Sequence, residues 1–297
     1  MNTRITTLAA AGLLCLAAPA EAEQNLQRKA AVSADAAIEI SNVSGRVEVT
    51  AWDRNEVDLD ATLTGDEDQL EFEAGDRRVR IKVTRPDKKL RGPKEATLIL
   101  RVPQGASLRT EVVSADLEIR GVRGEQRLNS VSGDVHTEAF TAPVALRTIS
   151  GDGTIAGTGG KAEVSVASVS GTLEVTNVQG SAEAETVSGE VTMRLGAVDR
   201  LKVGTVSGEF DGSLELLPGA RVELESISGE MDLRLKPPVN ADFEFESFSG
   251  DIEACFGPKA QAKSKYGPGR ELSFTQGSGG ALVQIETMSG EVRVCDH

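Results

Sequence analysis

Seven carboxylates recur at one position of a short repeat, directly after a Ser-Gly step: Asp134, Asp152, Glu190, Glu209, Glu230, Asp251 and Glu291. A pair of carboxylates can hydrolyse a glycosidic bond, and a stacked column could bind Ca²⁺ to relieve its own charge repulsion. A catalytic pair would be singular, however, and the nine-residue repeat of calcium-binding β-rolls is absent. We therefore interpret the acids as solvated turn residues, with calcium binding and a carbohydrate-active enzyme on a β-helix as the alternatives.

Residues for other kinds of catalysis are scarce. Nucleophile–base chemistry usually needs a histidine or a cysteine. The two histidines are His136, in an outward-facing column, and His297, the last residue. A sugar-binding groove would usually present aromatic platforms, and the chain has one Trp, one Tyr and eight Phe. The sequence predicts no catalytic residue, no cofactor and no metal site.

Two cysteines occupy equivalent positions, because Cys255 and Cys295 each lie five residues after a Ser-Gly step. If their repeats are neighbours, their Cα atoms lie about 4.8 Å apart, within the range of a disulfide. We predict this bond, which would close a loop of about 40 residues and contribute about 4 kcal/mol in the chain-entropy model. The gap between these two repeats then holds one repeat and an excursion at about 257–277. The alternative is two free thiols.

The elements that must position these residues belong to a repeat with the motif (S/T)-x-S-G, in which x is apolar. Eight copies are present, and their corners are Ser132-Gly133, Ser150-Gly151, Ser170-Gly171, Ser188-Gly189, Ser207-Gly208, Ser228-Gly229, Ser249-Gly250 and Ser289-Gly290. Weaker copies are Val43-Ser44-Gly45 and Val113-Ser114-Ala115. Spacings of 18 to 21 residues, before a last gap of 40, are too short for helix pairs and predict the coils of a β-solenoid.

Apolar and polar residues alternate on both sides of each motif, as in half-buried strands. In one repeat Val222, Leu224 and Ser226 share one parity. Ile227, Met231 and Leu233 share the other, so the apolar face switches parity inside the motif. Such a switch needs a bend or bulge, for which we expect the glycine to supply backbone freedom. We expect the first hydroxyl to point inward and the serines of successive repeats to stack.

Residues 23–110 differ from the repeats, and we predict a β-rich region of hairpins that caps the first coil of the 111–297 solenoid. One hairpin pairs Leu70–Glu73 with Arg77–Thr84. The basic run from Arg77 to Lys94 is interpreted as cross-strand ion pairs, with an anion-binding patch as the alternative.

Residues 1–22 read as an export signal, with an apolar run from Leu8 to Ala18 and a small-x-small cleavage site at Ala20-Glu21-Ala22. We expect cleavage after Ala22 and a periplasmic or extracellular protein; a lipoprotein attached at Cys15 is the alternative. The mature chain keeps the net charge of −14, because the segment holds one Arg and one Glu. This charge argues against nucleic acid and anionic bilayers as partners, and no later segment reaches the length of a membrane span.

The excursion carries four bases and no acid between Phe256 and Arg270: Lys259, Lys263, Lys265 and Arg270. We interpret it as a segment that lies over the acidic coils and covers the terminal edge. The alternative is a contact flap for an anionic glycan or a partner.

Several segments together resemble the bacterial β-strand-repeat family called "putative adhesin", a domain of unknown function: Ser44–Asp53, Leu100–Gly105, Thr205–Glu209, Ser226–Glu230 and Gly267–Val292. The resemblance implies an exported all-β solenoid with a β-rich N-terminal part, and it carries over no catalytic residue. We hypothesise a non-catalytic structural or interaction protein that presents a rigid surface to envelope polysaccharide or protein, with no oligomeric state implied. A carbohydrate-active enzyme and an envelope-stress accessory protein are the alternatives.

Overall fold

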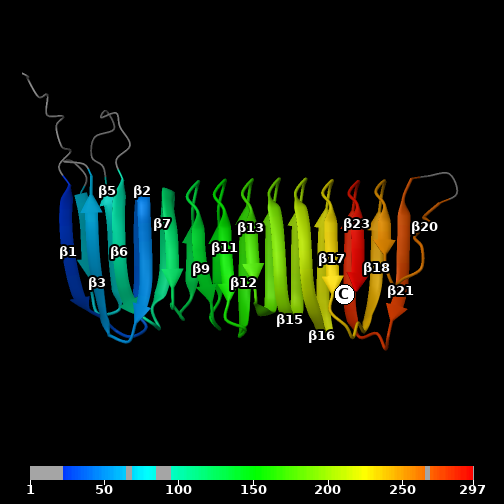
Figure 1. Cartoon of the computed structure of the whole chain (residues 1–297), viewed down its shortest axis with the longest axis horizontal. Coiled ribbons are helices and arrows are strands. Elements are labelled where there is room, and N and C mark those ends of the chain that lie inside the picture. Colours follow the sequence, from blue (N-terminus) through cyan, green and yellow to red (C-terminus); the bar gives the residue numbers. More distant parts are fainter. Residues whose placement is uncertain (1–22, 65–68, 85–94, 265–267, 297) are drawn as a thin grey trace, which may run out of the picture.

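The computed structural model describes residues 23–64, 69–84, 95–264 and 268–296. These residues form a single sheet of 23 strands that winds into an elongated stack (Figure 1), and no helix occurs among them. The all-β prediction is therefore confirmed. Consequently, no helix in the described part of the chain could cross a membrane. The predicted export signal, residues 1–22, lies outside the described residues.

The middle of the stack consists of strands that pair in parallel with the strand one repeat later. They are β7 (Ser107–Arg120), β8 (Gln126–Asn129), β9 (Val135–Ala139), β10 (Val144–Arg147), β11 (Gly153–Gly157), β12 (Lys161–Ser168), β13 (Leu173–Thr176), β14 (Gln179–Thr186), β15 (Glu190–Thr205), β16 (Glu209–Ser226) and β17 (Met231–Leu235). The registers keep equivalent motif positions side by side, as in the pairs Val135↔Gly153 and Gly153↔Leu173.

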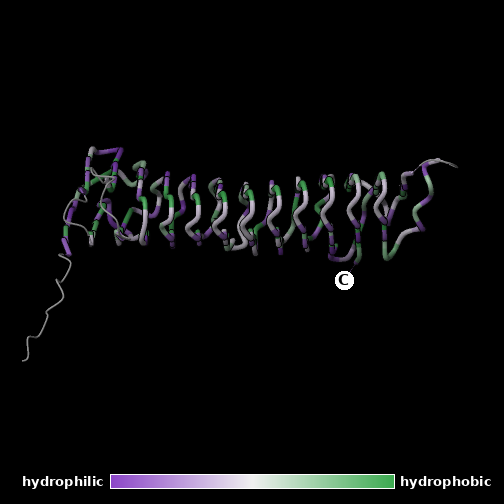
Figure 2. The backbone as a smooth tube through the Cα atoms, turned by 90° about the horizontal axis from the view of Figure 1, so that it is seen from above, coloured by the Kyte–Doolittle hydropathy of each residue, from purple (hydrophilic) through white to green (hydrophobic). Residues whose placement is uncertain are grey.

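The core lies between the two strands of each repeat. In β12, for example, Ala162, Val164 and Val166 are buried and the residues between them are more exposed. Figure 2 shows one loop of the backbone per repeat, arranged along a straight axis. The predicted alternation of apolar and polar residues is thus present, and every repeat contributes its buried residues to one continuous core.

The N-terminal region is not a set of ordinary hairpins, which corrects the prediction for residues 23–110. Its strands are β1 (Gln24–Ala31), β2 (Ala37–Trp52), β3 (Glu56–Leu63), β4 (Gln69–Ala74), β5 (Arg78–Thr84) and β6 (Ala96–Pro103). Strand β2 pairs in parallel with β7 on one side and with β5 and β6 on the other. The isolated motif copy in β2 therefore belongs to the stack, with Ser44 beside Ser114.

Antiparallel strands cover this end of the stack. The predicted hairpin is present as β4–β5, and β1 and β3 extend the sheet from β6. The arginines of the basic run make ion pairs, since Arg77 contacts Asp35 and both Arg78 and Arg80 contact Glu39. The ion-pair interpretation therefore holds for these three residues, whereas residues 85–94 lie outside the described part.

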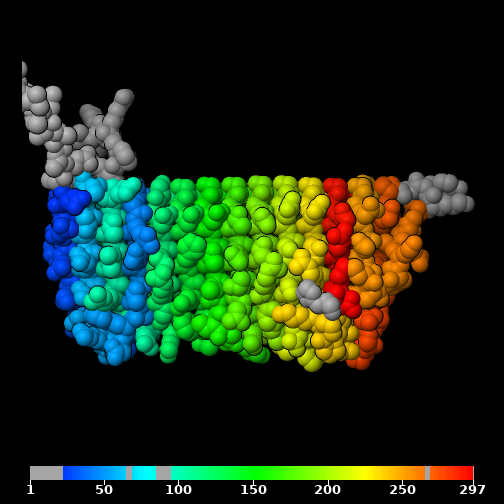
Figure 3. Space-filling model, viewed as in Figure 1, coloured from blue at the N-terminus to red at the C-terminus, as the bar shows by residue number. Residues whose placement is uncertain are grey.

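The last repeats are stacked out of sequence order. Strands β22 (Ala281–Thr287) and β23 (Val292–Asp296) lie between β16–β17 and the earlier strands β18 (Ala241–Ser247) and β19 (Ile252–Ala254). In Figure 1 the red β23 separates β17 from β18, and Figure 3 shows the same order in the packed surface. The repeats at this end therefore do not follow one another in chain order.

The excursion explains the altered order. It contains β20 (Gln261–Ala262) and β21 (Arg270–Gln276), and β21 pairs antiparallel with β18 on the side away from β22. The Phe243 ring of β18 stacks on Phe274 of β21, with centroids 4.8 Å apart. The aliphatic Val283 and Ile285 of β22 instead pair with Val222 and Leu224 of β16. Aromatic side chains thus lie at the covered end, and the aliphatic repeat fills the position inside it.

The two cysteine-bearing repeats are neighbours, as the sequence predicts. Strand β19 pairs with β23, and the Cα atoms of Cys255 and Cys295 lie 4.9 Å apart with their Sγ atoms at bonding distance. The pair can therefore form a disulfide without moving the backbone.

We predict that the exported protein contains the Cys255–Cys295 bond, and that Cys255→Ser lowers the free energy of unfolding by about 4 kcal/mol. The cause is the loss of a crosslink between residues separated by 40 positions. A non-reducing peptide map should show the crosslinked peptides, and urea unfolding should give the energy. Reduced wild-type protein is the control and should match the variant. Two free thiols in the exported protein would contradict the prediction.

Candidate functional site

Each motif places two consecutive residues on the outside of the corner. In the repeat around residue 228, Ser226 and Gly229 are buried, whereas Ile227 and Ser228 are exposed. The parity switch and the inward first hydroxyl are as predicted. The grouping of Ile227 with buried Met231 is wrong, because the backbone returns inward only at the glycine.

The corner glycines are required by close packing between repeats. A Cβ atom on Gly229 would overlap the carbonyl oxygen of Gly208, and a Cβ atom on Gly208 would overlap the carbonyl oxygen of Gly189. Of the motif glycines only Gly45 has a positive φ, at 110°. The expectation that glycine supplies unusual backbone freedom is therefore wrong for the eight full copies, where the missing side chain is what matters.

The hydroxyls satisfy the backbone at the corner. The first hydroxyl accepts from the glycine of its own motif, as Gly208 N donates to Thr205 Oγ1 at 2.8 Å. The second serine donates to the x residue of the adjacent repeat, as Ser207 Oγ donates to the Val187 carbonyl at 3.2 Å. The predicted stacking of serine hydroxyls on one another is seen as a direct bond at Ser132 and Ser114, 3.2 Å apart.

The x residues form a continuous row of exposed apolar side chains, here called the ridge: Val43, Val113, Val131, Ile149, Val169, Val187, Val206, Ile227, Met288 and Phe248. Their exposed fractions range from 39% at Val131 to 60% at Phe248. Backbone bonds fix their order, because each second serine donates its N–H to the x carbonyl of the adjacent repeat. At about 4.8 Å per step, the ridge is roughly 43 Å long.

A groove of about 920 Å³ runs beside the ridge from Arg147 to the excursion. One wall is the ridge from Val169 to Phe248, and the buried first hydroxyls form the floor. The other side is the column of residues that precede the motifs, in which Ala167 and Gly204 are small and leave the groove open. Pro268 and Gly269 close one end.

Carboxylates line the open side of the groove. Glu185, Glu225 and Glu286 project from the column that contains Gly204, and all three are exposed. Glu246 accepts a bond from Lys263 Nζ at 2.6 Å, and this contact raises the pKa of Lys263. The groove therefore combines an apolar wall with a negatively charged rim.

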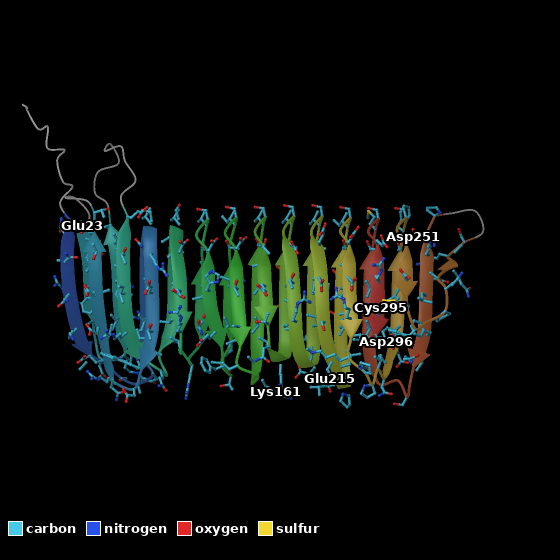
Figure 4. The ribbon with its side chains drawn as sticks, in the orientation of Figure 1. Glu23, Lys161, Glu215, Asp251, Cys295 and Asp296 are labelled. Carbon is cyan, nitrogen blue, oxygen red and sulfur yellow. A yellow bond between two sulfur atoms is a disulfide. The ribbon has the colours of Figure 1, made fainter. Side chains whose placement is uncertain are left out.

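The acids that follow each glycine lie at the same edge as the corners, as Asp251 shows in Figure 4, whereas Lys161 and Glu215 mark the opposite edge. Where the acid is aspartate it can accept from the next repeat: Asp152 N donates to Asp134 Oδ1 at 3.0 Å. His136 is exposed on β9. In the described ranges, no group of three or more His, Cys, Asp and Glu side chains could hold a metal ion.

The bases of the excursion contact the acids of the terminal repeats. Lys263 pairs with Glu246, and Arg270 pairs with Asp251 at 3.1 Å. Lys259 lines a small hollow with Glu244 and Glu271. Lys265 lies outside the described residues. These contacts agree with a segment that covers the terminal edge.

The chain is an all-β repeat protein built mainly from parallel strands, with the ridge exposed along its corners. The chain belongs to the Toastrack DUF4097 family, whose model matches residues 36–295. No curated protein sequence matches it significantly.

Similar solved structures include a "putative adhesin" from Bacteroides fragilis, with 12% identity, coverage of 92% of this chain and 98% of the other, and a TM-score of 0.47. Another is a "putative adhesin" from Parabacteroides merdae, with 13% identity, coverage of 91% and 96%, and a TM-score of 0.44.

Gly229→Ala should destabilise the protein by about 3 kcal/mol, because the added methyl group overlaps the Gly208 carbonyl. Gly204→Ala is the matched control, since a Cβ there meets nothing within 4 Å. The control should change stability by less than about 1 kcal/mol, towards stabilisation. Urea unfolding measures both, and equal effects would refute the role assigned to the corner glycines.

Thr205→Val should cost about 1–3 kcal/mol, because it leaves the buried Gly208 N–H without its acceptor while keeping the side-chain volume. Ser207→Ala, which removes an exposed hydroxyl two residues away, should change stability by less than about 0.5 kcal/mol. Thermal and urea unfolding compare the two. A larger effect at Ser207 would contradict this division of roles.

Proposed function

We propose that the protein is an exported, non-catalytic, adhesin-like β-solenoid with coils of 18–21 residues, and that its ridge is a contact surface for another protein. The observation that carries this proposal is the unbroken row of ten exposed apolar side chains. Scattered apolar residues are normal on protein surfaces, whereas a contiguous apolar patch is typical of an interaction site.

The chemistry of the ridge favours protein over polysaccharide. Eight of its ten side chains are Val or Ile, one is Met288, and Phe248 supplies the one aromatic ring. Aliphatic side chains offer no flat platform for sugar rings, but they pack well against apolar side chains of a protein partner. The parallel backbone pairing through every corner keeps this surface straight and rigid, so a partner meets it without an ordering cost in this chain.

Export is consistent with the disulfide-capable pair Cys255–Cys295, because such bonds persist in oxidising compartments. We propose a periplasmic or extracellular protein, cleaved after Ala22. Two bases of the excursion, Lys263 and Arg270, form ion pairs with acids of the terminal repeats. These pairs support a covering role for the excursion rather than a glycan site.

The triple variant Val206→Ser, Ile227→Ser, Met288→Ser should reduce binding of the mature protein to envelope fragments of the producing bacterium at least tenfold, because it removes three consecutive apolar side chains of the ridge. Ile99→Ser is the matched control, since Ile99 is 44% exposed but lies on β6 away from the ridge. Sedimentation of labelled protein with the fragments measures binding.

Protease treatment of the fragments should abolish the binding, and periodate oxidation of their sugars should leave it unchanged. The opposite pattern would assign the surface to polysaccharide. Equal binding by the ridge variant and wild type would show that the ridge is not the contact surface.

A further inference from the structure

The groove beside the ridge fits one class of ligand. We propose that it binds a basic amphipathic α-helix of a partner protein, with the apolar face of the helix against the ridge and its cations against the carboxylate rim. This inference rests on the proposed function, because it requires the ridge to be a protein contact surface. It adds the conformation and the charge of the partner.

The apolar wall has the length and the period of a helix face. Six ridge residues, from Val169 to Phe248, line the groove in consecutive repeats. Their five steps of about 4.8 Å give roughly 24 Å, the length of a helix of about 16 residues. Apolar residues at every third or fourth position of a helix recur about every 5.4 Å, close to the step between ridge side chains. Docking of such a helix in an apolar groove is a common mode of peptide recognition.

The side of the groove opposite the ridge has room for the side chains of that helix. Gly204 lies between Glu185 and Glu225 in the column opposite the ridge. Nothing lies within 4 Å of the position that a Cβ on Gly204 would take, so the hollow there is open. Val187 and Val206 form the facing wall. A large aliphatic side chain of the ligand can therefore enter at this point and contact apolar atoms of the ridge.

The charge of the rim selects a cationic ligand. Glu185, Glu225 and Glu286 line the groove, and no ion pair among the described residues neutralises any of them, whereas Glu246 is paired with Lys263. On the other side of the ridge lie the exposed acids that follow the corner glycines, among them Glu190 and Glu209. Lysines or arginines flanking the apolar face of a helix would meet carboxylates on both sides.

The same charges disfavour two other occupants. A second copy of this chain would bring its own acidic rims against these, in a protein whose net charge is −14. An anionic lipid surface would be repelled for the same reason. Charge complementarity thus favours the basic helix over a dimer or a membrane.

The test uses the mature protein, residues 23–297, and a labelled synthetic peptide of 18 residues made of Leu and Lys, with Leu at positions i, i+3, i+4 and i+7. Fluorescence anisotropy should show saturable binding that weakens as salt is raised. A peptide of the same composition with its leucines scattered around the helix, and one with Glu in place of Lys, should each bind at least tenfold more weakly.

Two variants locate the site. Gly204→Leu fills the hollow, and the triple variant Glu185→Gln, Glu225→Gln, Glu286→Gln removes the rim charge; each should weaken peptide binding at least tenfold. The triple variant Glu71→Gln, Glu174→Gln, Glu215→Gln removes the same charge from exposed positions elsewhere and should bind as wild type. Circular dichroism and thermal unfolding confirm that each variant is folded.

Several results would overturn the proposal: no binding of the Leu/Lys peptide, equal binding of the scattered peptide, or wild-type binding by both groove variants. Light scattering that shows a dimer dissolved by Ile227→Ser would assign the groove to a second copy, and flotation with anionic vesicles would assign it to lipid. If the ridge variant loses envelope binding but the peptide fails to bind, the contact function stands and the helix is wrong. If the ridge variant binds the envelope fragments as well as wild type and the peptide fails to bind, both the contact function and the helix proposal are rejected.

Discussion

The structure depends on the contact between the corner glycine of one repeat and the carbonyl of the glycine in the adjacent repeat. This approach leaves no space for a Cβ atom, so every corner lies directly on its neighbour. The buried glycine N–H then needs an acceptor inside its own repeat, which the first hydroxyl supplies. Both requirements fix the register of the columns, and the two residues between hydroxyl and glycine are left on the outside. The position of the ridge is therefore a geometric consequence of the corner.

Both ends of the parallel stack are covered by antiparallel strands. A parallel stack ends in strands with unpaired backbone groups, which invite pairing with another chain. At each end antiparallel strands lie outside the last parallel strands: β4 pairs with β5 and β3 pairs with β6 at one end, and β21 pairs with β18 at the other. The outermost strand β1 carries Arg28 and Lys29, charges that oppose further pairing. Antiparallel pairing thus ends the parallel stack on both sides.

The sequence predicts features that depend on local pattern. The repeat period, the inward first hydroxyl, the β4–β5 hairpin and the adjacency of Cys255 and Cys295 all follow from spacing and alternation. The order of the last repeats does not follow from the spacing, because a gap of 40 residues allows the final repeat, β22–β23, to lie on either side of the β18 repeat. The ridge was missed because a parity switch does not say which residues turn outward. One signal was available: x is apolar in all ten copies although in nine of them it stands between two polar residues, and a merely exposed turn would not require that.

An exposed apolar row about 43 Å long would ordinarily make copies of a protein associate. Here each flank of the ridge carries carboxylates, with Glu185 and Glu225 on one side and Glu190 and Glu209 on the other. Two copies that approach ridge to ridge must bring these acids together in water-poor surroundings, where like charges repel more strongly than in bulk water. The same arrangement favours binding of a partner that brings apolar side chains flanked by two rows of cations. The carboxylates on the two flanks, of which Glu190 and Glu209 belong to the column that first suggested catalysis, thus act in this interpretation on the choice of partner. They keep the ridge exposed in the free protein and available to a ligand of opposite charge.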